Sequence, residues 1–296
     1  MNKEDALAGE QAQTKMEYKK KDRIVKHLVK FILSSMILLA VYLNVLMFEK
    51  AITSESGDFQ WQPTRELLRH QNPYESFLSD NLFMAQMPLY PLTGYILLIP
   101  YAVMDWEYAK IAWALTNYLA TFVLLYCLQK LWKIQNTMIV VFLCSAFLIS
   151  KPYRNVICYG QHDLFVLALF VWSSVLAKKN KYLAGILLGL SWFKYSTTFP
   201  LSLYFIFKQG WKHILIGILT QCFLFMLVCL WIWQSPLHIL TTYLDALKLH
   251  TSYWAWHLFH LYSYVVFIIP IWWIVYFIEI RIGKNGSTKI IWKDVV

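Results

Sequence analysis

Side chains that could support chemistry lie in the polar links between the apolar runs of this chain. They are Asp58, Trp61, Arg154, Gln161, His162, Asp163, Lys194, Tyr195, Trp256 and His257. A carboxylate can accept a proton, and a lysine or arginine can hold an anion such as a phosphate. Ionisable groups at the edge of a membrane are costly unless they face a cavity, pair with each other or contact a substrate. We therefore predict that these links form the functional site.

Taken singly, each of these side chains also has an ordinary structural interpretation. Gly57 permits a turn that would aim the carboxylate of Asp58 inward, but a loop aspartate can equally be a helix cap or a solvated acid. Gln161 and His162 could orient sugar hydroxyls or simply cap a helix. Lys194 is the best candidate for holding a phosphate, and Arg154, which can make two parallel hydrogen bonds, is the second.

The histidines near the C-terminus form a weaker signal. His257 and His260 are three residues apart, so they share one helical face and could hold a metal ion, but two ligands make a poor site. The surrounding aromatic residues favour an interfacial cap, and these rings could also stack on a sugar. Of the 14 tryptophans, only Trp61 and Trp256 are candidates for that role.

The composition identifies the elements that must position these residues. The chain has 296 residues, of which 58% are hydrophobic and 15% charged, whereas a soluble domain has roughly 25% charged residues. The 27 Lys and Arg outnumber the 17 Asp and Glu. They cluster before the first apolar run and in short links, a pattern typical of cytoplasmic flanks rather than of a nucleic-acid surface. The sequence therefore predicts an all-α polytopic membrane protein.

The distribution of positive charge predicts the topology. The apolar runs cover residues 28–48, 89–104, 110–131, 136–150, 163–177, 181–193, 197–207, 212–234 and 258–280. Run 89–104 is interrupted by Pro91 and Pro100, which suits a juxtamembrane or re-entrant helix better than a crossing. If only the other eight runs cross, 19 Lys and Arg lie inside and 8 outside, and both termini are cytoplasmic.

Two further features of the chain shape the predicted site. The short runs 181–193 and 197–207 read either as half-helices that meet at Lys194, Tyr195 and Ser196 or as two ordinary short spans. The long first outer loop, residues 49–109, carries an amphipathic surface helix predicted over 63–71. The remaining boundaries are a basic cytoplasmic tail over 1–27, a transmembrane domain over 28–280 and a cytoplasmic tail over 281–296. Residues before Lys15 lack apolar periodicity and are expected to form a mobile tail.

An ordered set of short motifs carries a family resemblance. Gly57-Asp58-Phe59 is followed by Leu67-Leu68-x-x-x-Asn72-Pro73-Tyr74, by Tyr90-Pro91, by Gly160-Gln161-His162-Asp163, and by the segment from Leu183 to Leu190 with Phe193-Lys194-Tyr195 after it. This order resembles glycosyltransferase family 87, which consists of polyprenol-phosphate-mannose-dependent mannosyltransferases of the GT-C superfamily. The resemblance covers residues 45–212. The chain departs from the family pattern at Tyr195, where a proline is usual, and at Asp163.

The resemblance implies a GT-C-like bundle, for which the charge distribution predicts about eight transmembrane helices. The uncleaved basic N-terminus and the lack of a disulfide framework fit a bacterial plasma membrane. The resemblance also implies an inverting transfer of a hexose, such as mannose, from a polyprenyl phosphate to a lipid or glycan acceptor on the outer face. By resemblance, Asp58 matches the family's loop aspartate and would be the general base, with His257 as a secondary catalytic candidate. Gln161, His162, Asp163 and Tyr195 would bind sugar or acceptor.

Other functions stay open at this point. A transporter with a site at the broken spans, or a non-catalytic subunit of another membrane enzyme, would also fit a polytopic chain with a lysine at a helix break. Neither nucleic acid nor any cofactor is predicted as a partner, and the five cysteines show no metal-ligand spacing. A divalent metal ion stays an alternative because Glu55 lies close to Asp58.

Overall fold

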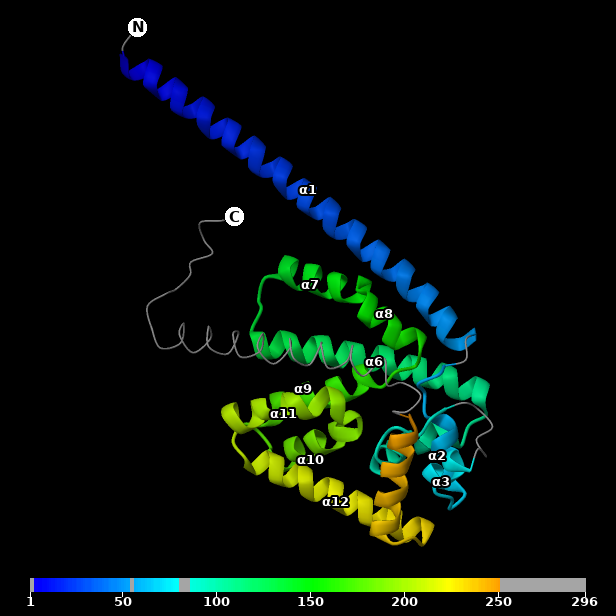
Figure 1. Ribbon diagram of the computed structural model, residues 1–296. Coiled ribbons are helices and arrows are strands. Elements are labelled where there is room, and N and C mark those ends of the chain that lie inside the picture. Colours follow the sequence, from blue (N-terminus) through cyan, green and yellow to red (C-terminus); the bar gives the residue numbers. More distant parts are fainter. Residues whose placement is uncertain (1–2, 54–55, 80–85, 251–296) are drawn as a thin grey trace. The chain divides into compact units, whose positions relative to one another are not determined.

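The computed structural model describes residues 3–53, 56–79 and 86–250. Every regular element in these ranges is a helix (Figure 1). By its internal contacts the chain divides into two units, Met1–Tyr243 and Leu244–Val296. The predicted all-α class is confirmed for the described part of the chain, and all the contacts discussed below lie within the first unit.

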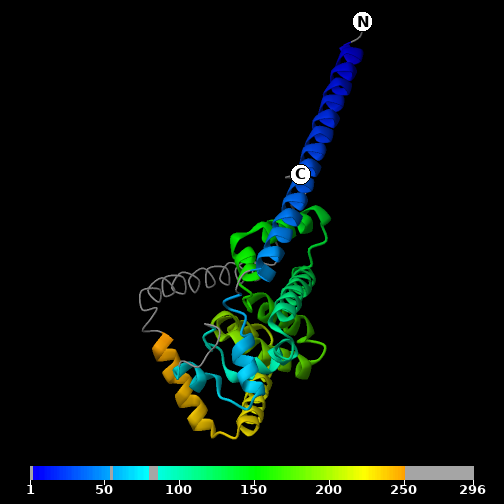
Figure 2. The same ribbon diagram turned by 90° about the vertical axis from the view of Figure 1, so that its right-hand side faces the viewer.

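The first helix is longer than predicted. Helix α1 runs without a break from Lys3 to Thr53, so the residues expected to form a mobile tail are helical (Figure 2). The physical reason is local, because this segment is rich in Ala, Glu, Gln and Lys, which have high helix propensity. The segment extends the apolar part of the same helix, so it does not need to form an unfavourable first turn by itself. Packing begins late in α1, where Ala40, Met47 and Ala51 are buried.

Three described helices are long and apolar enough to cross a membrane. They are Lys21–Thr53 within α1, α6 (Trp106–Trp132) and α12 (Lys212–Ile232). A fourth candidate is the pair α7 (Thr137–Ile149) and α8 (Lys151–Cys158), which is bent by 54°. The described residues thus support three or four spans, and the predicted number of about eight is not confirmed.

The shorter apolar runs explain this difference. Helix α9 (Asp163–Leu176) has 14 residues and α10 (Lys181–Ser191) has 11. Helices of this length cover about 15–20 Å, against a hydrocarbon core of roughly 30 Å. Apolar composition therefore predicted where helices form, but not whether each one crosses.

The predicted outer loop contains several short helices. They are α2 (Trp61–Leu68), α3 (Pro73–Leu78), α4 (Leu92–Tyr95), η1 (Ile96–Leu98) and α5 (Ile99–Ala102). The helix predicted over 63–71 is confirmed as α2, which buries most of its residues against its neighbours. As predicted from its prolines, the run 89–104 is not one straight helix. Asn72 begins α3 by accepting a hydrogen bond from the backbone N–H of Tyr74 (3.1 Å).

Helices α9, α10 and α12 lie side by side, with α10 packed against both of the others (Figure 1). Close approach of α10 and α12 depends on glycine: a Cβ at Gly189 would lie 2.7 Å from the carbonyl oxygen of Gly217. After α10 the chain forms a 3₁₀ turn, η2 (Trp192–Lys194), and then α11 (Tyr195–Lys208). The predicted helix break is therefore present, and Lys194 leaves helical geometry at φ −107° and ψ 77°.

Candidate active site

Asp58 lies in a turn that is attached to the end of α8. Its backbone N–H donates to the carbonyl oxygen of Tyr159 over 3.2 Å. The next residue, Phe59, has no exposed surface and stacks on Trp113 with ring centroids 5.2 Å apart. The indole N–H of Trp113 in turn donates to the carbonyl oxygen of Gly160 over 2.8 Å. These contacts fix the turn that carries Asp58 against the start of α9.

Gly160 makes this attachment possible. Its φ of +66° lies in the left-handed region, where a side chain is strained. A Cβ at this position would also lie 3.1 Å from Phe59 and 3.2 Å from Ser56. The chain can therefore pass this close to the Asp58 turn only with glycine at position 160.

Lys194 forms an ion pair with Asp163 at the first residue of α9. The Nζ–Oδ2 distance is 2.7 Å, and the other carboxylate oxygen accepts a hydrogen bond from Thr197 over 2.6 Å. The two charged side chains are only 16% and 21% exposed. The helix break after η2 places Lys194 here, because its own backbone has left the helix.

His162 lies beside this pair inside a cage of aromatic rings. Its ring centroid is 5.1 Å from that of Tyr90, 4.9 Å from Trp113 and 4.8 Å from Phe193. The residue is fully buried, and neither ring nitrogen has a hydrogen-bond partner among the described residues. Burial first, and then the charge of Lys194, holds the pKa of His162 well below its usual value. The ring is therefore neutral.

Tyr90 connects the two parts of the site. The Nζ of Lys194 lies 5.9 Å from the centroid of its ring. Burial raises the pKa of Tyr90 above its ordinary value, and the next contributions come from the charges of Asp58 and Asp163. Both carboxylates are therefore within electrostatic reach of one phenol. We call Tyr90, His162, Asp163, Lys194 and Thr197 the Lys194 cluster.

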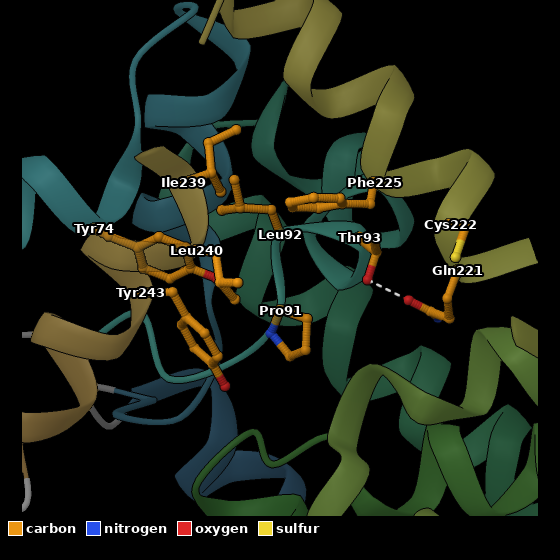
Figure 3. Close-up of a pocket in the computed structure, with 10 residues that line it drawn as sticks. All are labelled: Tyr74, Pro91, Leu92, Thr93, Gln221, Cys222, Phe225, Ile239, Leu240 and Tyr243. Atoms are coloured by element: carbon orange, nitrogen blue, oxygen red, sulfur yellow. Dashed lines mark hydrogen bonds between the residues drawn. The ribbon is translucent and has the colours of Figure 1, made fainter. Parts of the chain in front are cut away.

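A largely apolar cavity of about 310 Å³ lies next to this cluster. Figure 3 shows its lining: Tyr74, Pro91, Leu92, Thr93, Gln221, Cys222, Phe225, Ile239, Leu240 and Tyr243. The hydroxyl of Tyr74 donates to the carbonyl oxygen of Tyr90 over 2.6 Å, and that of Tyr243 lies 3.4 Å from the hydroxyl of Tyr195. A polar, charged centre and an apolar cavity are thus joined through tyrosine hydroxyls.

The comparisons with known proteins fit this arrangement. The family model of glycosyltransferase family 87 matches residues 89–278. The chain belongs to this family. The match confirms the resemblance seen in the sequence motifs, and together with the apolar helices it makes the chain a membrane glycosyltransferase. No curated protein and no solved structure matches the chain. The matched range includes the whole Lys194 cluster, whereas Asp58 lies before it.

The remaining predicted residues of this glycosyltransferase lie in varied surroundings. The Nε atom of Arg154, on α8, is buried without a hydrogen-bond partner among the described residues. Gln161 is half-buried, and its backbone N–H donates to Val156 over 2.9 Å. Tyr195 is 42% exposed beside the cavity. His257 and Trp256 lie outside the described residues.

Two residues predicted to contact sugar have protein partners in the structure. Trp61 is 8% exposed, its indole N–H donates to the carbonyl oxygen of Met104 over 3.1 Å, and Arg65 lies over its ring. Packing of the outer loop accounts for this tryptophan without a sugar. The carboxylate oxygens of Asp163 are bound by Lys194 and Thr197, and its contact with sugar or acceptor stays a prediction. In this structure Asp163 positions the lysine.

Sequence reasoning missed three residues of the site. Tyr90 was part of a family motif but received no role, although the following proline marks a turn. Thr197 lies three residues after Lys194, in the first turn of α11, and no motif marked it. Tyr243 had no local signal, because only the packing of a distant helix brings it to Tyr195. In the described ranges no group of three or more His, Cys, Asp or Glu could hold a metal ion.

Proposed function

We propose that this membrane glycosyltransferase moves a hexose from a polyprenyl phosphate to a hydroxyl group of a lipid or glycan acceptor, with inversion at the anomeric carbon. The observation that carries the proposal is the ion pair of Lys194 with Asp163 beside Tyr90 and an apolar cavity, with the charge of Asp58 also acting on Tyr90. A lipid-linked sugar phosphate has the same division into a charged head and an apolar tail. Mannose is the hexose that the family resemblance implies.

In this proposal Asp58 is the general base. Its carboxylate takes the proton of the acceptor hydroxyl while the acceptor oxygen forms a bond to the anomeric carbon. The bond between that carbon and the phosphate oxygen breaks, and its electron pair leaves with the phosphate. A phosphate departs as an anion, so no second carboxylate is needed to protonate it, unlike in glycoside hydrolysis.

Lys194 supports the departing phosphate. Its ammonium group is held at a fixed place by Asp163 and lies in a poorly hydrated wall, where charge stabilisation is stronger than in water. Asp163 and Thr197 are positioning residues, because they act through the lysine. The cavity next to Tyr90 would take the first isoprene units of the donor, and Tyr195 and Tyr243 would line the boundary between head and tail.

The test is turnover of the full chain in proteoliposomes with a radiolabelled short-chain polyprenyl-phosphate mannose and a lipid extract as the source of acceptor. The Asp58→Asn variant is expected to lose about 100- to 10,000-fold in turnover, the usual contribution of a general base. It should still bind the donor, because the change leaves the Lys194 cluster intact.

Asp105→Asn is the matched control. Asp105 is an exposed aspartate of the outer loop, and its side chain makes no capping hydrogen bond at the start of α6. Its variant is expected to turn over like the unmodified chain. Full turnover by Asp58→Asn would remove Asp58 from the mechanism. A chain that neither releases nor transfers the labelled sugar would contradict the choice of donor and leave a transporter or a non-catalytic subunit as the better interpretation.

A further inference from the structure

A second cavity lies between α1, α6, α7 and α8, and it shares no lining residue with the cavity beside Tyr90. Its volume is about 440 Å³, which falls within the usual range of roughly 300–1,000 Å³ for small-molecule sites. Most of the wall is aliphatic or aromatic, with Ile37, Val41, Phe122 and Leu148 as examples. None of the described residues that line it carries a charge.

Several polar side chains interrupt the apolar wall; the hydroxyl of Tyr153 is buried without a hydrogen-bond partner among the described residues, and two further groups also lack partners there. Ser145 of α7 is 4% exposed, and its hydroxyl has no hydrogen-bond partner among the described residues. Asn44 of α1 donates from Nδ2 to the carbonyl oxygen of Ala40 over 2.7 Å, but its buried Oδ1 accepts nothing from the described part of the chain. Buried polar atoms are nearly always paired, because an unpaired one keeps its full desolvation cost.

The chemistry of these two groups restricts the ligand. The oxygen of Asn44 needs a donor, and the hydroxyl of Ser145 can give a hydrogen bond as well as accept one. A ligand hydroxyl can donate to the oxygen of Asn44 or accept from the hydroxyl of Ser145. A phosphate or an ammonium head group is disfavoured, because the lining offers no opposite charge to offset its desolvation.

The surroundings indicate where the ligand comes from. Val41 is 58% exposed on α1, and Phe122 is 72% exposed on α6. Both helices are candidate membrane spans, so apolar side chains exposed on them contact lipid. The ligand therefore reaches this cavity from the bilayer.

We propose that this cavity binds an uncharged lipid that carries one free hydroxyl group. The hydroxyl lies between Asn44 and Ser145, and the chain extends along the apolar wall formed by α1 and α6. Diacylglycerol and a long-chain isoprenoid alcohol share this chemistry. The site does not depend on the transfer reaction proposed above, because none of its lining residues belongs to the Lys194 cluster.

Equilibrium binding to the full chain in phosphatidylcholine nanodiscs tests the proposal. Radiolabelled 1,2-dioctanoylglycerol and geranylgeraniol are the two probes, and their O-methyl ethers are the matched controls that cannot donate a hydrogen bond. Saturable binding of at least one alcohol is expected, with its ether binding about three- to tenfold more weakly, as the loss of one neutral hydrogen bond predicts. The probe that binds identifies the source of the lipid.

A variant pair places the binding in this cavity. Ser145→Ala should weaken binding about three- to tenfold and should fold normally, because it removes an unpaired hydroxyl. Ser174→Ala is the control: Ser174 is also 4% exposed, but its hydroxyl donates to Phe170 within α9 over 3.1 Å. It should bind like the unmodified chain.

Photo-crosslinking gives a second readout that does not depend on any variant. A diazirine analogue of dioctanoylglycerol is expected to label peptides of α1, α6 or α7. Equal binding of alcohol and ether, unchanged binding by Ser145→Ala, or labels confined to peptides outside these helices would each overturn the proposal.

Discussion

Two polar networks in this chain differ in their exposure to solvent. The difference distinguishes a network that is expected to act on a ligand from one that holds two segments together. The first is the Lys194 cluster. The second, which we call the α3 network, consists of Asn72, Glu75, Gln234 and His238. Glu75 contacts both Gln234 (2.9 Å) and His238, and Asn72 donates to Gln234 over 2.8 Å. Both networks join segments far apart in the sequence.

Their environments are opposite. The charged side chains of the Lys194 cluster are 16% and 21% exposed, and the cluster encloses a histidine without a partner. Glu75 and His238 are 41% and 49% exposed, so solvent screens their attraction. A nearly dry cluster with unused hydrogen-bonding capacity is expected to act on a ligand, whereas a solvated network holds two segments together.

The largest effect that would separate the two networks is expected from Lys194→Met. Removing the cation that faces the departing phosphate should lower turnover about 100- to 1,000-fold, as the loss of one electrostatic stabiliser usually does. If the unpaired carboxylate of Asp163 destabilises the Lys194→Met variant, the double variant Lys194→Met/Asp163→Asn should restore folding. It should not restore turnover. A turnover assay measures the loss of activity, and thermal unfolding in detergent measures whether folding is restored. Recovery of turnover in the double variant would show that the lysine only neutralises Asp163.

Gly160→Ala tests how tightly the Asp58 turn is attached to the Lys194 cluster. The matched control is Gly210→Ala, because Gly210 also has positive φ (+92°) but nothing within 4 Å of an added Cβ. Both variants carry the left-handed strain, and only Gly160→Ala adds close contacts with Phe59 and Ser56. We expect Gly160→Ala to be less stable than Gly210→Ala by about 1–3 kcal/mol and to turn over more slowly. Equal thermal stability of the two variants would mean that the turn moves away without cost.

His162 predicts a pH dependence of the stability of the chain. Its pKa in the folded chain is lowered, so below pH 6.5 the unfolded chain binds a proton that the folded chain does not. The free energy of unfolding therefore falls as the pH drops from 6.5 toward the lower pKa of the folded state. The slope for one proton is about 1.4 kcal/mol per pH unit. His162→Phe, which keeps an aromatic ring in the cage, should remove this slope in thermal unfolding between pH 7 and about pH 5.

The smallest effect is expected in the α3 network. A double-mutant cycle with Glu75→Gln and His238→Gln at pH 6 should give a coupling energy below about 1 kcal/mol, as for other exposed ion pairs. Turnover should stay unchanged in all three variants, and 1 M salt should abolish the coupling. A turnover loss comparable to that of Lys194→Met would break the distinction drawn between the two networks.

Local patterns predicted the helices of this chain well. Asn136 and Asn180 each begin a helix close to where an apolar run was predicted to start. Pro91 and Pro100 correctly predicted that run 89–104 is broken. The length of the first helix was underestimated, because charged residues with high helix propensity leave no apolar periodicity to read.

The candidate site was predicted in part. Asp58, His162, Asp163 and Lys194 were all selected, and His162 and Lys194 lie against the ring of Tyr90 in the structure. Their relations were not predicted: the ion pair of Asp163 with Lys194 was not expected, and Tyr90 received no role. The sequence of one chain shows which side chains can ionise, but it does not show which of them pair with each other in the folded structure.

The order of the helices, their caps and breaks, and the family motifs follow from the sequence by itself, because hydrogen bonds and apolar periodicity within a helix involve residues only a few positions apart. The tertiary structure alone decided that Lys194 meets Asp163, 31 positions away, and that the turn of Asp58 binds the end of α8. Such contacts depend on how helices cross and on where a glycine lets two segments approach. A change in crossing of a few ångströms would leave every helix intact and separate these side chains.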